Sequence, residues 1–183
     1  MKYIRRALWF IATRLVIVCV CVAILITAFY MALNSGNIYI LVTEGMHKRV
    51  EVALTREDAV ELNKYFGAEF LANDPVMNAA FSENSPYIDY RITDFDHAIT
   101  LEWLWAWPWQ NTAYCTITER VPEIEGKVAS SRVNDVTGDI PAWQGGEYDV
   151  TLLKTNGQWR IVGLKQTKVI LEPTPVPEQV ENE

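Results

Sequence analysis

The sequence is poor in cysteine and histidine, and each shortage excludes a class of protein. Cys19 and Cys21 lie inside a hydrophobic stretch, so Cys115 is the single thiol in the rest of the chain. No intrachain disulfide can form there, unlike in most small eukaryotic secreted domains. The two histidines, His47 and His97, are far apart in sequence and have no Cys or His near them at metal-ligand spacing. We predict a domain without disulfides, metal or cofactor, of a kind common at bacterial surfaces.

Catalytic signatures and excess basic charge are also missing. The sequence has no Gly-x-Ser-x-Gly elbow, no phosphate-binding glycine loop and no His-Glu-x-x-His. Its 16 Lys and Arg are outnumbered by 23 Asp and Glu, for a net charge of −7. A nucleic-acid-binding protein needs a basic face, so this class is excluded. With 50% hydrophobic and 21% charged residues, the chain can nevertheless bury a core.

Charge is absent from one long stretch. No charged residue occurs between Arg14 and Glu44, and residues 15–33 are almost entirely hydrocarbon. As a helix, these residues would span about 28 Å, close to the thickness of a bilayer core. We therefore predict a transmembrane helix at 15–33, with the lipid bilayer as its partner.

The flanking charges predict how this helix is oriented. Residues 1–14 contain four basic residues and no acid, which favours a cytoplasmic N-terminus. The apolar core is longer than the roughly 7–15 residues of a cleaved signal peptide, and no small-x-small cleavage site follows it. We predict an uncleaved signal anchor in the cell membrane. Residues 34–170 then form an extracytoplasmic domain, and 171–183 form an extended tail rich in Pro and Glu.

The first part of the domain shows helical spacing. After a break at 34–37, apolar residues between 38 and 50 predict a juxtamembrane helix. Thr55 and Asp58 resemble a capping box, so we predict a second helix over about 56–72. A further short helical turn is expected at 76–81.

From residue 87 the pattern alternates with the period of a β-strand. The predicted strands are 87–93, 95–107, 113–121, 127–136, 147–154 and 158–170. Asn156-Gly157 is a strong signal for a tight hairpin between the last two. In the strand before it, Tyr148, Val150 and Leu152 should share one face, opposite Asp149 and Thr151. Helices followed by antiparallel strands indicate an α+β domain in which the helices pack on a curved antiparallel sheet.

Four of the seven tryptophans lie between residues 103 and 109. In an unbroken strand, strict alternation places one set of side chains on a single face: Phe95, His97, Ile99, Leu101, Trp103, Trp105 and Trp107. Three interpretations remain open for this aromatic row. It forms a wall of the core, it lines a cavity or platform for a small apolar or glycan-like ligand, or it contacts the membrane surface. The candidate ligand-binding residues are Trp103, Trp105, Trp107 and His97.

His97 is the one candidate for a general base. No acidic residue of its own strand shares its face, because Asp96 points away. We therefore predict no catalytic residue, and we expect a hydrogen-bonded histidine instead. The basic triplet His47-Lys48-Arg49 has two interpretations, a solvated helix face or a contact with anionic lipid. The solvated face is favoured.

The predicted domain resembles the NTF2-like superfamily, in which helices pack against a strongly bent antiparallel sheet to form a cone. Three features carry the resemblance: the apolar face of Ala59, Leu62, Phe66 and Phe70, the long strand that ends at Trp107, and the closing hairpin formed by 146–154 and 157–162. The resemblance covers about residues 38–170. Some members of the superfamily are enzymes with an Asp/His pair in the cone, but His97 has no such partner on its face, so that activity is not carried over.

A single N-terminal membrane helix before an NTF2-like domain is similar to the layout of membrane assembly subunits of type IV secretion and conjugation systems. This resemblance is one of architecture. It implies a membrane-anchored interaction or assembly module without catalytic activity, with other membrane or envelope proteins, or a second copy of the chain, as partners. A ligand-binding module with an aromatic cavity and a cone enzyme with His97 as base are the alternatives.

Overall fold

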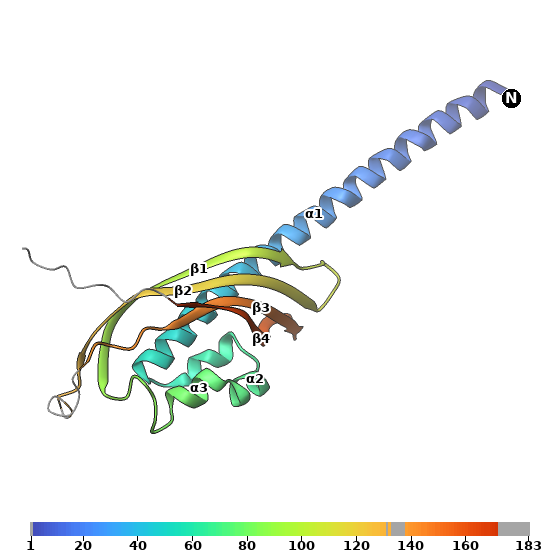
Figure 1. The fold of residues 1–183 in the computed structure, drawn as a ribbon. Helices are drawn as coiled ribbons and strands as arrows, with labels where there is room; N and C mark the ends of the chain where they lie inside the picture. Colours follow the sequence, from blue (N-terminus) through green and yellow to red (C-terminus); the bar gives the residue numbers. More distant parts are fainter. Residues whose placement is uncertain (1, 131, 133–137, 172–183) are drawn as a thin grey trace, which may run out of the picture.

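The computed structural model describes residues 2–130, 132 and 138–171. Its elements in chain order are α1 (Lys2–Thr55), η1 (Ala59–Lys64), α2 (Ala68–Asn73), α3 (Pro75–Ala80), β1 (Tyr90–Trp105), β2 (Thr112–Val128), β3 (Gln144–Thr155) and β4 (Gln158–Leu171). The strands form one open antiparallel sheet in the order β1-β2-β3-β4. Figure 1 shows the helices on one face of this curved sheet. The predicted α+β class is confirmed.

A single helix of 54 residues contains both the apolar N-terminal stretch and the first helix of the domain. The predicted break at 34–37 is wrong, because α1 runs through Gly36 without interruption. Isolated poor helix formers cost only about 1 kcal/mol each, and the packing of the following turns outweighs that cost. Ile38, Val42, Met46 and Val50 lie on one side of α1 and are each at most 1% exposed. Their helical spacing was predicted correctly.

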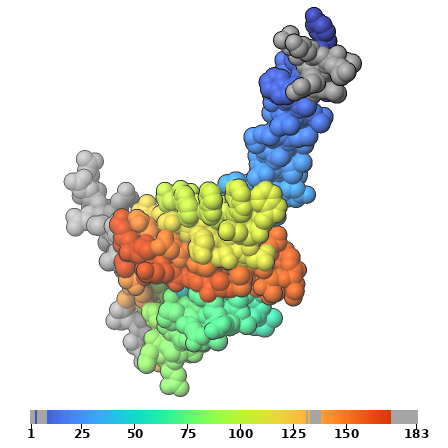
Figure 2. All heavy atoms as spheres, turned by 90° about the vertical axis from the view of Figure 1, so that its right-hand side faces the viewer, coloured from blue at the N-terminus to red at the C-terminus, as the bar shows by residue number. Residues whose placement is uncertain are grey.

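The N-terminal part of α1 projects away from the rest of the protein (Figure 2). Over the described residues, α1 is the one helix long and apolar enough to cross a membrane, on the criteria of length and composition. None of the side chains in its most apolar window is buried. That window therefore has no protein core around it.

The predicted continuous helix over 56–72 is wrong. The chain forms the short helix η1, forms a β-bridge with Ile161 at Phe66, is extended at Gly67, and then forms α2. The backbone N–H of Gly67 donates to the Ile161 carbonyl oxygen at 2.8 Å, and the Ile161 N–H donates to the Tyr65 carbonyl oxygen at 2.8 Å. Pairing with β4 thus replaces one turn of helix. Asp58 caps η1 directly, accepting from the Val60 N–H at 2.9 Å, and α3 confirms the short helix expected at 76–81.

Four strands replace the six that were predicted. The first two form the single strand β1, and the expected strand at 127–136 is reduced to the end of β2, with most of its other residues outside the described part. The closing hairpin is confirmed: Asn156 (φ 52°) and Gly157 (φ 81°) both have positive φ, as the tight turn requires. The predicted alternation in β3 is also confirmed, because Tyr148, Val150 and Leu152 are buried. The tail at 171–183 lies outside the described residues, apart from Leu171 at the end of β4.

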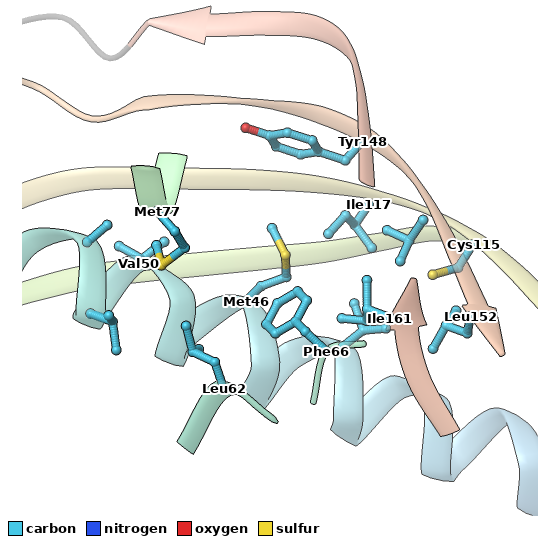
Figure 3. Close-up of a cluster of buried hydrophobic side chains, with 14 of the residues drawn as sticks. Met46, Val50, Leu62, Phe66, Met77, Cys115, Ile117, Tyr148, Leu152 and Ile161 are labelled. Carbon is cyan, nitrogen blue, oxygen red and sulfur yellow. The ribbon is translucent and has the colours of Figure 1, made fainter. Parts of the chain in front are cut away.

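The core fills the space between α1 and the concave face of the sheet (Figure 3). Every helix and strand except α2 and β1 contains at least one buried hydrophobic side chain. The labelled members of the core are Met46, Val50, Leu62, Phe66, Met77, Cys115, Ile117, Tyr148, Leu152 and Ile161. The C-terminal half of α1 is thus the central helix of the domain.

Candidate functional site

The aromatic row of β1 does not keep to one face of the sheet. Leu101 pairs with Ile117, but Trp103 pairs with Thr116, so β1 has one extra residue at Glu102. Such a bulge reverses the alternation of the residues that follow it. Trp103 and Trp105 are consequently 52% and 43% exposed. The interpretation of these two residues as a wall of the core is wrong.

Four exposed aromatic residues and the half-buried Trp107 form a surface that is here called the tryptophan patch: Trp103, Trp105, Trp107, Trp109 and Tyr114. The rings of Trp105 and Trp107 are stacked, with centroids 6.1 Å apart, and Trp109 meets Trp107 edge to face at 5.4 Å. Tyr114, on β2, pairs directly with Trp105 and is 49% exposed. The patch occupies the turn between β1 and β2 and the adjacent outer face of the sheet.

His97 lies on the opposite, concave face, away from the tryptophan patch. Its Nε2 atom is 3.3 Å from the Glu119 Oε1 atom, and the two side chains are only 2% and 0% exposed. The absence of an acidic partner, inferred from β1 alone, is therefore corrected, because Glu119 is on the neighbouring strand. Diagonal neighbours on paired strands share a face. Only the register of β1 against β2 could reveal this partner.

His47 connects this buried pair to the surface. Its Nδ1 atom lies 3.3 Å from the Nδ1 atom of His97, and its ring stacks on Phe95 with centroids 5.1 Å apart. The pKa of His47 is lowered, first by partial burial and then by the charge of His97. Two histidines that are 50 positions apart in sequence are thus neighbours in the fold.

Glu119 is the centre of a buried polar cluster. Besides contacting His97, its carboxylate accepts a hydrogen bond from Trp143 Nε1 at 3.3 Å and interacts with the Tyr148 hydroxyl. Burial, followed by the charge of Glu119, raises the pKa of Tyr148 to about 12. Glu119 pairs with Gly146 on β3, and an added Cβ at Gly145 would lie 2.5 Å from the Glu119 carbonyl oxygen. The lack of a side chain at Gly145 therefore allows β3 to approach Glu119 closely.

Arg49 and Asp74 form a buried ion pair beside this cluster. Arg49 Nε and Nη2 donate to the two Asp74 carboxylate oxygens at 2.7 and 2.8 Å, and Arg49 and Asp74 are only 3% and 1% exposed. Burial by itself lowers the pKa of Arg49, but the hydrogen bonds and charge of Asp74 outweigh that effect, so the pKa is raised. The favoured solvated interpretation of the basic triplet is wrong for Arg49. Lys48 does reach the surface, where it contacts Glu51 at 3.0 Å.

The geometry of the polar cluster suits a structural role better than catalysis. A histidine oriented by a carboxylate is a common arrangement for a general base, but the base must also reach its substrate. The side chains of His97 and Glu119 are enclosed, and the exposed His47 is next to His97. Over the residues that the structure describes, no group of three or more His, Cys, Asp or Glu side chains is arranged to hold a metal ion.

Two shallow hollows lie on the surface, and neither is lined by the candidate ligand-binding residues. One is bordered by Phe95 and four acidic residues, Asp94, Asp96, Glu123 and Glu125. The other lies between the end of α1 and the start of β1. The tryptophans of β1 thus form an exposed surface rather than either of these hollows. Comparison with protein-family models, curated proteins and solved structures gives no match for this chain.

Proposed function

We propose that this protein is a single-pass membrane protein whose extracytoplasmic domain is an interaction or assembly module. The observation that carries the proposal is the continuity of α1. Its apolar N-terminal part has no protein core around it, while its C-terminal part is the central helix of the domain. A helix of this length is a stiff connection, so the domain is held in one orientation toward the membrane.

The charges of the chain support the same arrangement. The basic residues before the apolar stretch favour a cytoplasmic N-terminus, and the domain beyond it is acidic. Confinement to a membrane raises the effective concentration of the domain toward other membrane proteins, so contacts of modest strength suffice for assembly. The side chains of His97 and Glu119 are only 2% and 0% exposed, so a substrate has little access to them. This burial favours the assembly role over the enzyme alternative.

We also propose that the domain is NTF2-like. The curved sheet with helices on its concave face and the closing hairpin of β3 and β4 support this assignment. A role like that of the assembly subunits of secretion or conjugation systems follows as a proposal from the architecture.

Membrane attachment is tested on the full chain in intact cells. We expect the protein to remain in the membrane pellet after alkaline carbonate extraction, and external protease to remove the domain. A chain that is released by carbonate, or a domain that protease cannot reach, would contradict the proposal.

Assembly is tested by photocrosslinking from exposed positions next to the membrane. Tyr39 and Ile40 are 47% and 53% exposed, so a photoreactive residue at either position should form discrete adducts with other membrane proteins or with a second copy. Gly36→Pro should abolish the adducts because proline interrupts the stiff helix, whereas Gly36→Ala should preserve them. Absence of any protein adduct at both positions would refute the role in assembly.

A further inference from the structure

The tryptophan patch lies at the end of the sheet from which α1 leaves the domain. Figures 1 and 2 both show the turn between β1 and β2 beside the point where the helix projects outward. On α1, the half-buried residues Met31 and Asn34 precede Ile38, the first fully buried residue of the helix. The patch therefore lies at the end of the domain that faces the apolar stretch.

The distance along the helix leaves little room between the domain and a bilayer. From Leu33, the end of the apolar stretch, to Ile38 in the core is a rise of about 8 Å at roughly 1.5 Å per residue. The headgroup region on each side of a bilayer core is itself about 5–8 Å thick. If residues 15–33 span the membrane, as the proposed function requires, this end of the domain must rest among the headgroups.

The chemistry of this end suits a headgroup layer. No Asp, Glu, Lys or Arg occurs from Trp103 to Thr118, which covers the end of β1, the turn and much of β2. Tryptophan and tyrosine prefer the membrane interface, where the ring is in an apolar environment and the N–H or O–H group remains hydrated. Four acidic residues of the same two strands, Asp94, Asp96, Glu123 and Glu125, lie toward the opposite end, where repulsion from anionic lipids costs least. Glu102 is the acidic residue next to the patch, and it accepts a hydrogen bond from the Thr118 hydroxyl at 3.2 Å.

We propose that the tryptophan patch is a second membrane contact, with its indole rings placed in the headgroup layer of the bilayer that α1 crosses. The inference rests on the proposed function, since it requires the helix to be a membrane span. Its partner is a lipid surface. With α1 as one support and the patch as the other, the domain cannot rotate freely about the helix axis or tilt away from the membrane.

The test uses the full chain in vesicles of phosphatidylcholine and phosphatidylglycerol, with Trp9→Phe to remove the tryptophan at the other end of the span. A lipid that carries a nitroxide high on its acyl chain should quench much of the tryptophan fluorescence. The triple variant Trp103→Phe, Trp105→Phe, Trp109→Phe should lose most of that quenching. The half-buried Trp107 of the patch remains, together with a shielded background from Trp143 and Trp159, which are each only 6% exposed.

Phe81→Trp in the triple variant is the matched control. Phe81 is 47% exposed, close to the 43% of Trp105, but it follows α3 at the opposite side of the domain from the projecting helix. We expect aqueous iodide to quench this reporter at least about twofold more strongly than the patch, and the nitroxide lipid to leave it unaffected.

Two outcomes would overturn the inference. In one, iodide quenches the patch as strongly as the control and the nitroxide lipid has no effect, so the patch faces water. In the other, the patch is protected from both quenchers and crosslinks to a protein, so a second copy or another partner covers it. If the chain still resists carbonate extraction in these experiments, only the membrane contact of the patch fails. If carbonate releases it, the proposed function fails as well.

Discussion

The buried ion pair between Arg49 and Asp74 gives the most demanding test of the structure. Asp74→Asn keeps the size of the side chain and its ability to cap α3, where Asp74 accepts from the Val76 N–H at 3.0 Å. It removes the charge that faces a guanidinium only 3% exposed. The variant therefore isolates the effect of leaving Arg49 buried without its bonded partner.

The magnitude follows from the burial of both groups. Removing one partner of a buried pair typically costs about 3–5 kcal/mol, because the remaining charge is desolvated and uncompensated. With a urea dependence of about 1–3 kcal/mol per molar, the unfolding midpoint should fall by roughly 2 M. Arg49→Met should also destabilise the domain. The double variant Arg49→Met, Asp74→Asn should be no less stable than either single variant, since it leaves no unpaired charge.

The assay is urea unfolding of the full chain in detergent, followed by tryptophan fluorescence. Glu61→Gln provides the control, because Glu61 pairs with Lys64 at 2.8 Å but at the surface, and its loss should leave the midpoint unchanged. If Asp74→Asn costs less than about 1 kcal/mol, or if the two single effects simply add, the pair is not buried and coupled as the structure describes.

Four further predictions concern other parts of the protein. The pKa of His47 is lowered in the folded state, so the unfolded chain binds a proton at His47 more readily than the folded chain does. The stability of the folded chain is therefore highest above about pH 6.5 and decreases as the pH falls. The melting temperature should drop slightly from about pH 7.5 to about 5.5, and His47→Gln should reduce that drop. Gly36→Ala should stabilise the chain by about 0.5–1 kcal/mol, since nothing lies within 4 Å of the new methyl group. Gly145→Ala should instead lower the melting temperature because its Cβ would clash with β2. Cys115 is buried, and burial raises the pKa of its thiol to about 12. With the other two cysteines replaced by serine, Cys115 should resist maleimide at neutral pH and react once urea unfolds the chain. Rapid reaction of the folded chain would contradict the burial of Cys115.

The sequence by itself determined the features that depend on neighbouring residues. The apolar stretch at 15–33 has the length and composition of a membrane span; it is helical, and no side chain of the most apolar window is buried. Asn156-Gly157 fixes a tight turn because these two residues tolerate positive φ. The alternation in β3 places its apolar side chains in the core, since both irregularities of its pairing with β4 put the extra residue in β4.

Only the tertiary structure decided how distant segments meet. The pattern within β1 contains no sign that the bulge at Glu102 turns Trp103 and Trp105 outward, because the bulge arises from pairing with β2. The same pairing brings Glu119 to His97, and the packing of α1 against α3 brings Arg49 to Asp74. Local periodicity specifies which residues of one segment share a face, but partners on other segments depend on register and packing, and the free energy of those contacts decides them.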